Sequence, residues 1–356
     1  MLDAQEDYLS RHVQPSGADI NYHLEQLITQ CTPSTSANAA LYKEMLTTVV
    51  RMAQADRNRW DAKIMLQTLK EMESAFAALE PFKRRRKVTV FGSARTPASH
   101  PLYQQAQALG KALAAADLMV ITGAGGGIMA AAHEGAGLDH SLGLNITLPF
   151  EQSANATVAN TANVLSFHFF FLRKLFFVKE ADALVLCPGG FGTLDEALEV
   201  LTLIQTGKSP LVPIVLLDAP GGSYWQDLLG FIERQLADPH YILPSDLSLM
   251  TLTTSVTEAC EHITDFYRNF HSTRWLDGQF VVRLNHALND AALEAINRDF
   301  ADLCLSGGFV QQHSTAAEYD EPELAGLARL TFAFNGRDHG RLRQLVDVLN
   351  APTHWR

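Results

Sequence analysis

Cysteine is scarce in this sequence. Its 356 residues contain four, none in a C-x-x-C pair, at the widely separated positions Cys31, Cys187, Cys260 and Cys304. So sparse a set provides no disulfide framework and is typical of reduced thiols. Long apolar runs are missing too, since none approaches the roughly 20 residues that span a bilayer, and the first residues are acidic where a secretory signal would be basic. We therefore expect a cytoplasmic protein with no membrane partner.

Positive charge is the next scarcity. The chain has 28 Lys and Arg against 39 Asp and Glu, which gives a formal net charge of −11. A general nucleic-acid binder needs cations to neutralise phosphates, so we expect no nucleic acid among the partners. A basic run at residues 83–87 falls between a predicted helix and a predicted strand. We expect it to be a solvated linker face, and a site for an acidic effector is the alternative.

Motifs of metal and cofactor chemistry are also missing. No cluster of residues has metal-ligand spacing, and no Lys-Ser or Lys-Thr pair closes a glycine-rich turn as in a Walker loop. The glycine turn at residues 123–127 fits the dinucleotide fingerprint poorly, because no acidic residue ends the next strand. No lysine has the setting of a pyridoxal phosphate Schiff base. We expect neither a metal nor an organic cofactor, and a mononucleotide is the better ligand.

What the sequence does contain is a regular alternation of apolar runs and helical periodicity from residue 86 to residue 270. Such alternation predicts a parallel sheet with helices on both faces, which is a doubly wound, Rossmann-like α/β domain. The expected strands are residues 88–91, 118–122, 142–148, 164–169, 183–187, 212–217 and 249–252. The expected helices are residues 102–115, 129–136, 171–181, 193–205, 224–236 and 256–270.

The two flanks have a different pattern. Residues 1–85 are predicted to be a helical segment that packs on the main domain or on a second subunit, with its last helix over residues 58–79. Residues 271–356 are predicted to be a small α+β domain of ferredoxin or ACT type. Its expected strands are residues 280–284, 309–313 and 330–334, and its expected helices are residues 290–303 and 339–349.

The rest of the chain is organised around residues 182–199. A buried strand breaks at Pro188 into a glycine turn, and we expect Thr193 to open a helix with Asp195 and Glu196 in its first turn. Glycines let a backbone approach a ligand, and the free N–H groups of a helix start bind anions. Because carboxylates repel a phosphate, we expect Asp195 and Glu196 to face another part of the same ligand.

Three turns follow strands of the predicted sheet and should therefore share its ligand-binding edge. They are residues 92–95, which contain Ser93, residues 123–127 and residues 188–193. The second turn alone is a weak signal, because tight packing explains it equally well. Together the last two predict a phosphate cradle made of Gly125, Gly126, Gly127, Gly189, Gly190, Gly192 and Thr193.

Charged residues near these turns are the candidates for chemistry. Arg173 lies in an apolar stretch, so it is expected to hold a phosphate or a carboxylate, while Lys174 beside it is either a ligand-binding or a surface cation. Asp195 or Glu196 could activate water or stabilise positive charge on a sugar; helix-start charges are the alternative. We expect packing roles for His133, Glu134, His168 and Cys187.

These residues, taken in order, resemble the LOG family. The similarity is carried by Gly125-Gly126-Gly127-Ile128-Met129, by Arg173-Lys174, and by Pro188-Gly189-Gly190-Phe191-Gly192-Thr193-Leu194-Asp195-Glu196, within residues 88–270. Members of the family are nucleoside 5′-monophosphate phosphoribohydrolases, and many were formerly labelled lysine decarboxylases. The resemblance implies cleavage of a purine, pyrimidine or cytokinin-type nucleotide into free base and ribose 5-phosphate. A nucleotide sensor that no longer cleaves its ligand is the alternative.

The resemblance also implies roles for single residues. Arg173 and Glu196 match the catalytic pair of the family, and the glycine loops with Thr193 would hold the 5′-phosphate. Ser93, Lys174 and Asp195 are further substrate-binding candidates. Asp195 stands where the family usually has glutamate, which affects the placement of substrate hydroxyls. Family members are usually dimers, so we expect a homodimer or a higher homo-oligomer, with an apolar interface supplied by the aromatic-rich residues 169–178.

Overall fold

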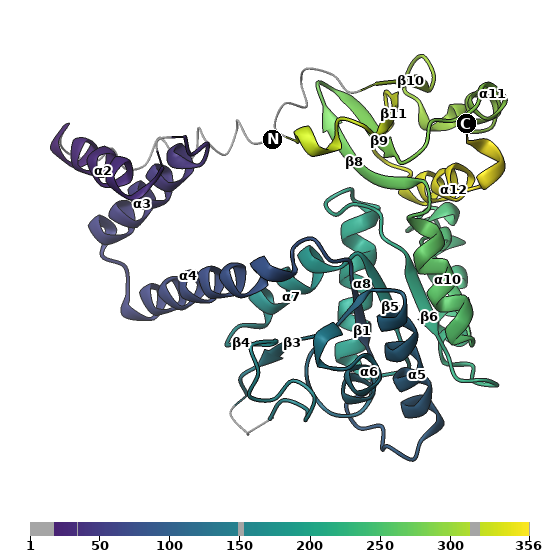
Figure 1. Cartoon of the computed structure of the whole chain (residues 1–356), viewed down its shortest axis with the longest axis horizontal. Helices are drawn as coiled ribbons and strands as arrows, with labels where there is room; N and C mark the ends of the chain where they lie inside the picture. The colour runs from purple at the N-terminus through teal and green to yellow at the C-terminus, as the bar shows by residue number, and fades with distance from the viewer. Residues whose placement is uncertain (1–17, 34, 149–152, 314–320, 356) are drawn as a thin grey trace. The chain divides into compact units, whose positions relative to one another are not determined.

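The computed structural model describes residues 18–33, 35–148, 153–313 and 321–355 (Figure 1). The chain divides into two compact units, residues 1–71 and residues 72–356. The first unit contains the helices α2 (Ala18–Cys31) and α3 (Ala39–Ala55) and most of α4 (Arg59–Leu79). These helices confirm the helical character predicted for the N-terminal segment, while its limit at residue 85 stays a prediction. No helix of the described ranges is both long and apolar enough to cross a membrane.

A seven-stranded parallel sheet forms the centre of the second unit and confirms the predicted α/β class. The sheet runs in the order β4-β3-β2-β1-β5-β6-β7, so the chain first builds outward on one side of β1 and then on the other. Its strands are β1 (Lys87–Phe91), β2 (Met119–Thr122), β3 (Ser141–Ile146), β4 (Val164–Phe167), β5 (Ala183–Leu186), β6 (Ile214–Leu217) and β7 (Met250–Thr253). The order reverses between β1 and β5, which is where ligands bind in such folds.

Helices cover both faces of this sheet, as its strand composition requires. Side chains alternate along β1, so that Val88 and Val90 pack with α5, α6 and α10, whereas Phe91 packs with α7 and α8 on the other face. Figure 1 shows α5 and α6 side by side on the first face. The helices are α5 (Pro101–Ala115), α6 (Ile128–Ala136), α7 (Phe170–Glu180), α8 (Phe191–Gln205), α9 (Tyr224–Ile232) and α10 (Val256–Phe266).

Several element ends differ from the predictions by a few residues. The strands β3 and β4 end at Ile146 and Phe167, two residues before the predicted limits. The helix α9 ends at Ile232 and continues as a π-helical turn, Glu233–Ala237. Short 3-10 segments lie at Glu80–Phe82, Leu138–His140, Pro244–Leu249, Ala301–Leu303, Pro322–Leu324 and Pro352–His354.

The C-terminal part is a small α+β region with a four-stranded antiparallel sheet in the order β10-β11-β9-β8. Its elements are β8 (Phe270–Leu276), β9 (Gln279–Leu284), α11 (Asp290–Asp299), β10 (Val310–Gln312), β11 (Ala328–Phe332) and α12 (His339–Leu349). The prediction of a helix to residue 270 is wrong, since α10 ends at Phe266 and β8 follows. The burial of residues along β8 has no clear period of two, which is why the sequence analysis missed this strand.

The missed strand changes how the C-terminal region compares with a ferredoxin-like domain. The chain order is strand, strand, helix, strand, strand, helix, instead of the β-α-β-β-α-β order of that type. In a ferredoxin-like sheet the last strand lies beside the first. Here β8, which precedes β9 in the chain, takes that edge position beside β9.

Candidate active site

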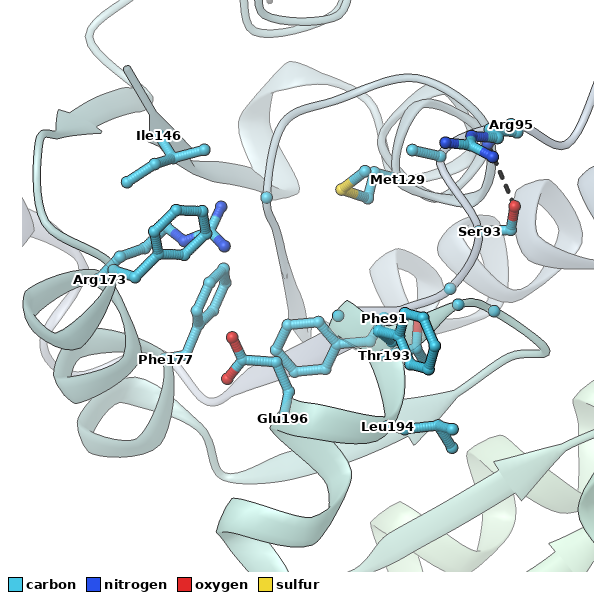
Figure 2. A pocket seen from close by; sticks show the side chains of 18 of the residues that line it. Phe91, Ser93, Arg95, Met129, Ile146, Arg173, Phe177, Thr193, Leu194 and Glu196 are labelled. Atoms are coloured by element: carbon cyan, nitrogen blue, oxygen red, sulfur yellow. Dashed lines mark hydrogen bonds between the residues drawn. The ribbon is translucent and has the colours of Figure 1, made fainter. Parts of the chain in front are cut away.

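A cavity of about 800 Å³ opens at the carboxyl edge of the sheet where the strand order reverses. Its walls come from the turns after β1 and β5 and from the helices α7 and α8 (Figure 2). Among the predicted site residues it brings together Arg173 and Glu196 with Ser93, Gly189, Gly190, Gly192 and Thr193. The position is the one that a doubly wound sheet offers to ligands.

Ser93 joins the three turns at this edge. Its backbone N–H donates to the carbonyl oxygen of Pro188 at 3.1 Å, which ties the β1 turn to the β5 turn. Its carbonyl oxygen accepts from the N–H of Ile128 at 3.0 Å, which ties the same turn to the start of α6. The three turns therefore meet, as the alternation of strands and helices predicts.

The start of α8 differs from the prediction in a way that matters for ligand binding. Gly190 is the N-cap in an extended conformation, and the helix begins at Phe191, so Thr193 is its third residue. The prediction that Asp195 and Glu196 lie in the first turn is therefore wrong, because Phe191 and Gly192 already have helical geometry. The first N–H groups of the helix have no intrahelical acceptor, and the carboxylates follow a turn later, away from an anion bound there.

The β5 turn is held rigidly from two sides. A Cβ on Gly189 would lie 2.2 Å from the hydroxyl oxygen of Thr193, so only glycine fits this position. The hydroxyl of Tyr224 on α9 donates to the carbonyl oxygen of Gly189 at 2.7 Å. This close packing fixes the direction in which the start of α8 points.

The glycine-rich turn after β2, residues 123–127, packs against the turn that follows β1. A Cβ on Gly127, which has a φ of +61°, would lie 2.2 Å from the carbonyl oxygen of Ser93, and one on Gly126 would lie 3.3 Å from that of Ala94. Gly125, Gly126 and Gly127 are not among the described residues that line the cavity, whereas Gly123 is. The geometry thus supports close backbone packing, and their contact with a substrate stays a prediction.

His133 and Asn155 fix the conformation of this second turn. His133 is fully buried, its Nε2 lies 3.1 Å from the carbonyl oxygen of Leu142, and its Nδ1 lies 3.2 Å from the Asn155 amide nitrogen. The same amide donates to the carbonyl oxygen of Gly125 at 3.2 Å. Burial lowers the pKa of His133 to about 4, so the ring is neutral at physiological pH. The expected packing role of His133 is confirmed.

Glu196 is the buried acid of the cavity. The residue is 4% exposed, and Figure 2 shows the carboxylate facing the space between Phe177, Phe91 and Arg173. Burial raises the pKa of Glu196 to about 7, although the charges of Lys174 and Arg173 oppose the rise. Within the described parts of the chain its Oε2 has no hydrogen-bond partner. A carboxylate with this pKa can both carry charge and accept a proton near neutral pH.

Arg173 faces the same space from α7. Its guanidinium lies over the rings of Phe170 and Phe177, with 4.9 Å and 5.4 Å from Cζ to the ring centroids. Burial lowers the pKa of Arg173, and the charges of Glu196 and Asp195 oppose that change. Across the described ranges it forms no ion pair within 4.0 Å, and its buried Nε has no partner. The guanidinium is thus free to bind a substrate oxygen.

Lys174 and Asp195 lie outside the cavity wall. The ammonium of Lys174 is 2.7 Å from a carboxylate oxygen of Asp195, 2.7 Å from one of Glu199 and 3.7 Å from one of Glu196. Burial acts to lower the pKa of Lys174, but these carboxylates outweigh it and raise the pKa. The cluster joins α7 to α8 behind Glu196, and a direct substrate contact of Lys174 or Asp195 stays a prediction.

Some lining residues were missed by the sequence analysis. Arg95 had a usable signal, because it follows β1 at the ligand-binding edge. Apolar residues gave none, since their periodicity is that of any core helix or strand. They are Phe91, Met129, Ile146, Leu148, Phe170, Phe177, Phe191 and Leu194.

Comparison with known proteins identifies the family of this chain. A family model described as "Possible lysine decarboxylase" matches residues 126–263. The chain is 31% identical over 204 residues to probable cytokinin riboside 5′-monophosphate phosphoribohydrolase LOGL2 of Oryza sativa subsp. japonica, a match that covers 55% of this chain and 79% of the relative. The chain belongs to the LOG family.

Another curated relative and a solved structure are each similar to about half of this chain. Cytokinin riboside 5′-monophosphate phosphoribohydrolase LOG3 of Arabidopsis thaliana is 29% identical over 202 residues, covering 55% of this chain and 89% of the relative. A solved molybdenum cofactor binding protein of Rippkaea orientalis superimposes with a TM-score of 0.36 at 20% identity, over 51% of this chain and 96% of that one. The family-model match runs from the turn after β2 to α10, so this LOG-family chain carries Arg173 and Glu196 inside the matched region.

Proposed function

We propose that the chain hydrolyses the N-glycosidic bond of nucleoside 5′-monophosphates and releases the free base and ribose 5-phosphate. The observation that carries this proposal is the spacing along α8. The N–H groups of Phe191 and Gly192 begin the helix, and the buried carboxylate of Glu196 follows in the same cavity. Four residues of helix advance about 6 Å, so a phosphate held at the helix start brings its sugar over Glu196.

The phosphate end of the substrate would be held by backbone groups. The N–H groups of Phe191 and Gly192 are unpaired by the helix itself, and the positive end of the helix dipole favours an anion there. The buried Thr193 adds a hydroxyl beside Gly189. These groups would fix the position of the ribose relative to α8.

Glu196 would act on the other end of the ribose. As the bond from C1′ to the base nitrogen breaks, its electron pair leaves with the base and positive charge develops on the sugar. A carboxylate stabilises this charge more strongly than the neutral ground state, which is the requirement for catalysis. Water then adds to C1′, and its proton passes to Glu196 or to the departing base. Arg173 would orient Glu196 or a ribose hydroxyl.

The base would be recognised chiefly by apolar contact. Apolar side chains that line the cavity include Phe91, Phe177, Met129 and Leu148, and no described lining residue is an asparagine or a glutamine. Stacking and apolar contact accept any base, whereas discrimination between bases needs paired hydrogen bonds. We therefore propose a broad scope that includes purine, pyrimidine and cytokinin-type monophosphates.

The decarboxylase label of the family model fits these residues poorly. Lysine decarboxylation would use pyridoxal phosphate bound to a lysine. None of the described residues that line the cavity is a lysine. Lys174, the nearest candidate in sequence, is hydrogen-bonded to Glu199 and paired with Asp195. These contacts support a phosphoribohydrolase rather than a Schiff-base enzyme.

We also propose that the chain is a homodimer. On α7, Phe170, Phe171 and Leu175 are 52%, 56% and 45% exposed, and Leu198 on α8 is 50% exposed. An apolar patch of this kind beside a site supports a protein interface. Light scattering at micromolar concentration should give twice the chain mass, and a Phe171→Asp variant should give a monomer. A monomeric wild type would contradict the proposal.

A cytoplasmic location is part of the same proposal. It is supported by the state of the cysteines, all four of which are free thiols in the structure. Free thiols persist in a reducing compartment. Fractionation of the source cells with an antibody against the chain would test this location.

Activity is tested with a panel of nucleoside monophosphates. Purified protein should release free base from AMP, CMP and a cytokinin riboside monophosphate, detected by chromatography, together with ribose 5-phosphate. Binding of AMP without release of base from any member of the panel would leave the alternative, a nucleotide sensor.

A further inference from the structure

The charge of a phosphate monoester is not matched by the groups assigned so far. Such a phosphate carries about −1.5 to −2 near pH 7, whereas a helix N-terminus supplies roughly half a positive charge. Lys174 is already paired with Asp195 and Glu199. Arg173 lies on the Glu196 side of the cavity, away from Thr193 in the first turn of α8 (Figure 2). A further cation near the start of α8 would stabilise a phosphate bound there.

Arg95 is placed to supply it. The turn that carries Arg95 is fixed by two hydrogen bonds. The backbone N–H of Arg95 donates to the Ser93 hydroxyl at 3.1 Å, and the backbone N–H of Ser93 donates to the carbonyl oxygen of Pro188 in the β5 turn. Its side chain lines the cavity, is exposed, and forms no ion pair with any residue that the structure describes. Figure 2 shows Arg95 beside Ser93, on the side of the cavity opposite Arg173 and Glu196.

We propose that Arg95 binds the 5′-phosphate together with the first N–H groups of α8, and so makes the site select nucleotides over nucleosides. The inference rests on the proposed function. A guanidinium binds phosphate oxygens through two parallel N–H donors, which adds both charge and direction to the backbone groups. With Arg95 at the phosphate and Glu196 at the anomeric carbon, the cavity holds its substrate in one direction only.

The test compares substrates with and without the phosphate. Wild type, Arg95→Ala, Arg95→Lys and the control Arg84→Ala are assayed with AMP and with adenosine. Arg84 is exposed and does not line the cavity, so its variant removes the same charge elsewhere. We expect Arg95→Ala to raise KM for AMP about 10- to 100-fold, the scale of a lost charge-assisted hydrogen bond, with kcat nearly unchanged. Any cleavage of adenosine should stay as it was, and Arg95→Lys should recover part of the loss.

Binding of ribose 5-phosphate, measured by calorimetry, separates the two proposals. If the wild type cleaves AMP and Arg95→Ala keeps the same KM, only the role of Arg95 is overturned. A lower kcat at constant KM would overturn it as well. If the wild type cleaves no nucleotide, the proposed function fails. In that case, weaker binding of ribose 5-phosphate by Arg95→Ala than by the wild type would still support phosphate binding by Arg95. Equal binding would overturn it.

Discussion

The two glycine-rich turns of the LOG domain look alike in sequence but have different surroundings. A Cβ on Gly127, after β2, would lie 2.2 Å from a backbone oxygen of Ser93. A Cβ on Gly190 or on Gly192, after β5, would meet no described atom within 4 Å. Gly127 permits one backbone to pack on another, whereas Gly190 and Gly192, which follow the tightly packed Gly189, leave a helix start open to a ligand. Composition alone does not distinguish these uses; what faces the turn does.

The difference should be largest in turnover. Glu196→Gln, on the helix after the β5 turn, should lower kcat by roughly 10³-fold or more, because the amide cannot stabilise a positive sugar. Glu134→Gln is the matched control on the helix after the β2 turn, where the carboxylate accepts from Tyr103 outside the cavity. It should leave kcat within a few-fold. Release of base from AMP measures both, and near-normal activity of Glu196→Gln would show that another group carries the chemistry.

Stability should separate the turns in the opposite sense. Gly127→Ala forces a side chain against the Ser93 carbonyl at a positive φ, so we expect a loss of about 3 kcal/mol or more in the free energy of unfolding. Gly190→Ala has a φ of −91° and open space, so its unfolding midpoint should match that of the wild type. The added methyl would instead intrude on the phosphate and weaken AMP binding. Equal destabilisation by both variants would erase the distinction between the turns.

The same contrast shows how far the sequence could go. Alternating strands and helices were enough to predict the parallel sheet and the edge at which the three turns meet. The roles of the turns were not predictable, because the contact of Gly127 with Ser93 joins residues that are distant in the chain. The start of α8 was placed too late for a related reason. Threonine is a good N-cap in isolation, but here Gly190 takes that place and Thr193 lies buried inside the helix.

The sequence analysis named the charged residues beside Glu196 but did not predict which of them contact one another. The sequence indicated Arg173 and Lys174 as a pair, yet adjacent positions on a helix point in different directions. One therefore faces the cavity and the other faces Asp195 and Glu199. The strand β8 was missed because its residues lack the alternation that marks a half-buried strand.

A pH series tests the ionisation of Glu196, which lies on the helix after β5. The pKa of Glu196 is raised from 4.5 to about 7 by burial, so the folded state holds this proton more tightly than the unfolded state does. The contribution of Glu196 to the free energy of unfolding is therefore complete below pH 4.5 and is lost as the pH rises through 7. Glu196→Gln should therefore be more stable than the wild type above pH 7, by on the order of 2–3 kcal/mol, and the gap should close towards pH 5. Wild-type kcat/KM should rise with pH around 7. A constant gap in unfolding midpoint from pH 5 to pH 8 would contradict the shifted pKa.

The smallest effect is expected on the β2 side, from Asn155→Ala. The change removes the amide that binds both the Gly125 carbonyl and the ring of His133, so it leaves buried polar atoms unpaired at a cost of about 1–2 kcal/mol. Asn163→Ala is the control, because its amide also makes two hydrogen bonds, in this case to the carbonyl oxygens of Leu138 and Ser141. Both variants should lose similar stability in denaturant titrations. Only Asn155→Ala should also raise KM for AMP, by a few-fold, since the β2 turn supports the Ser93 turn that borders the ligand; an equal KM in the two variants would mean that the support is not transmitted to the cavity.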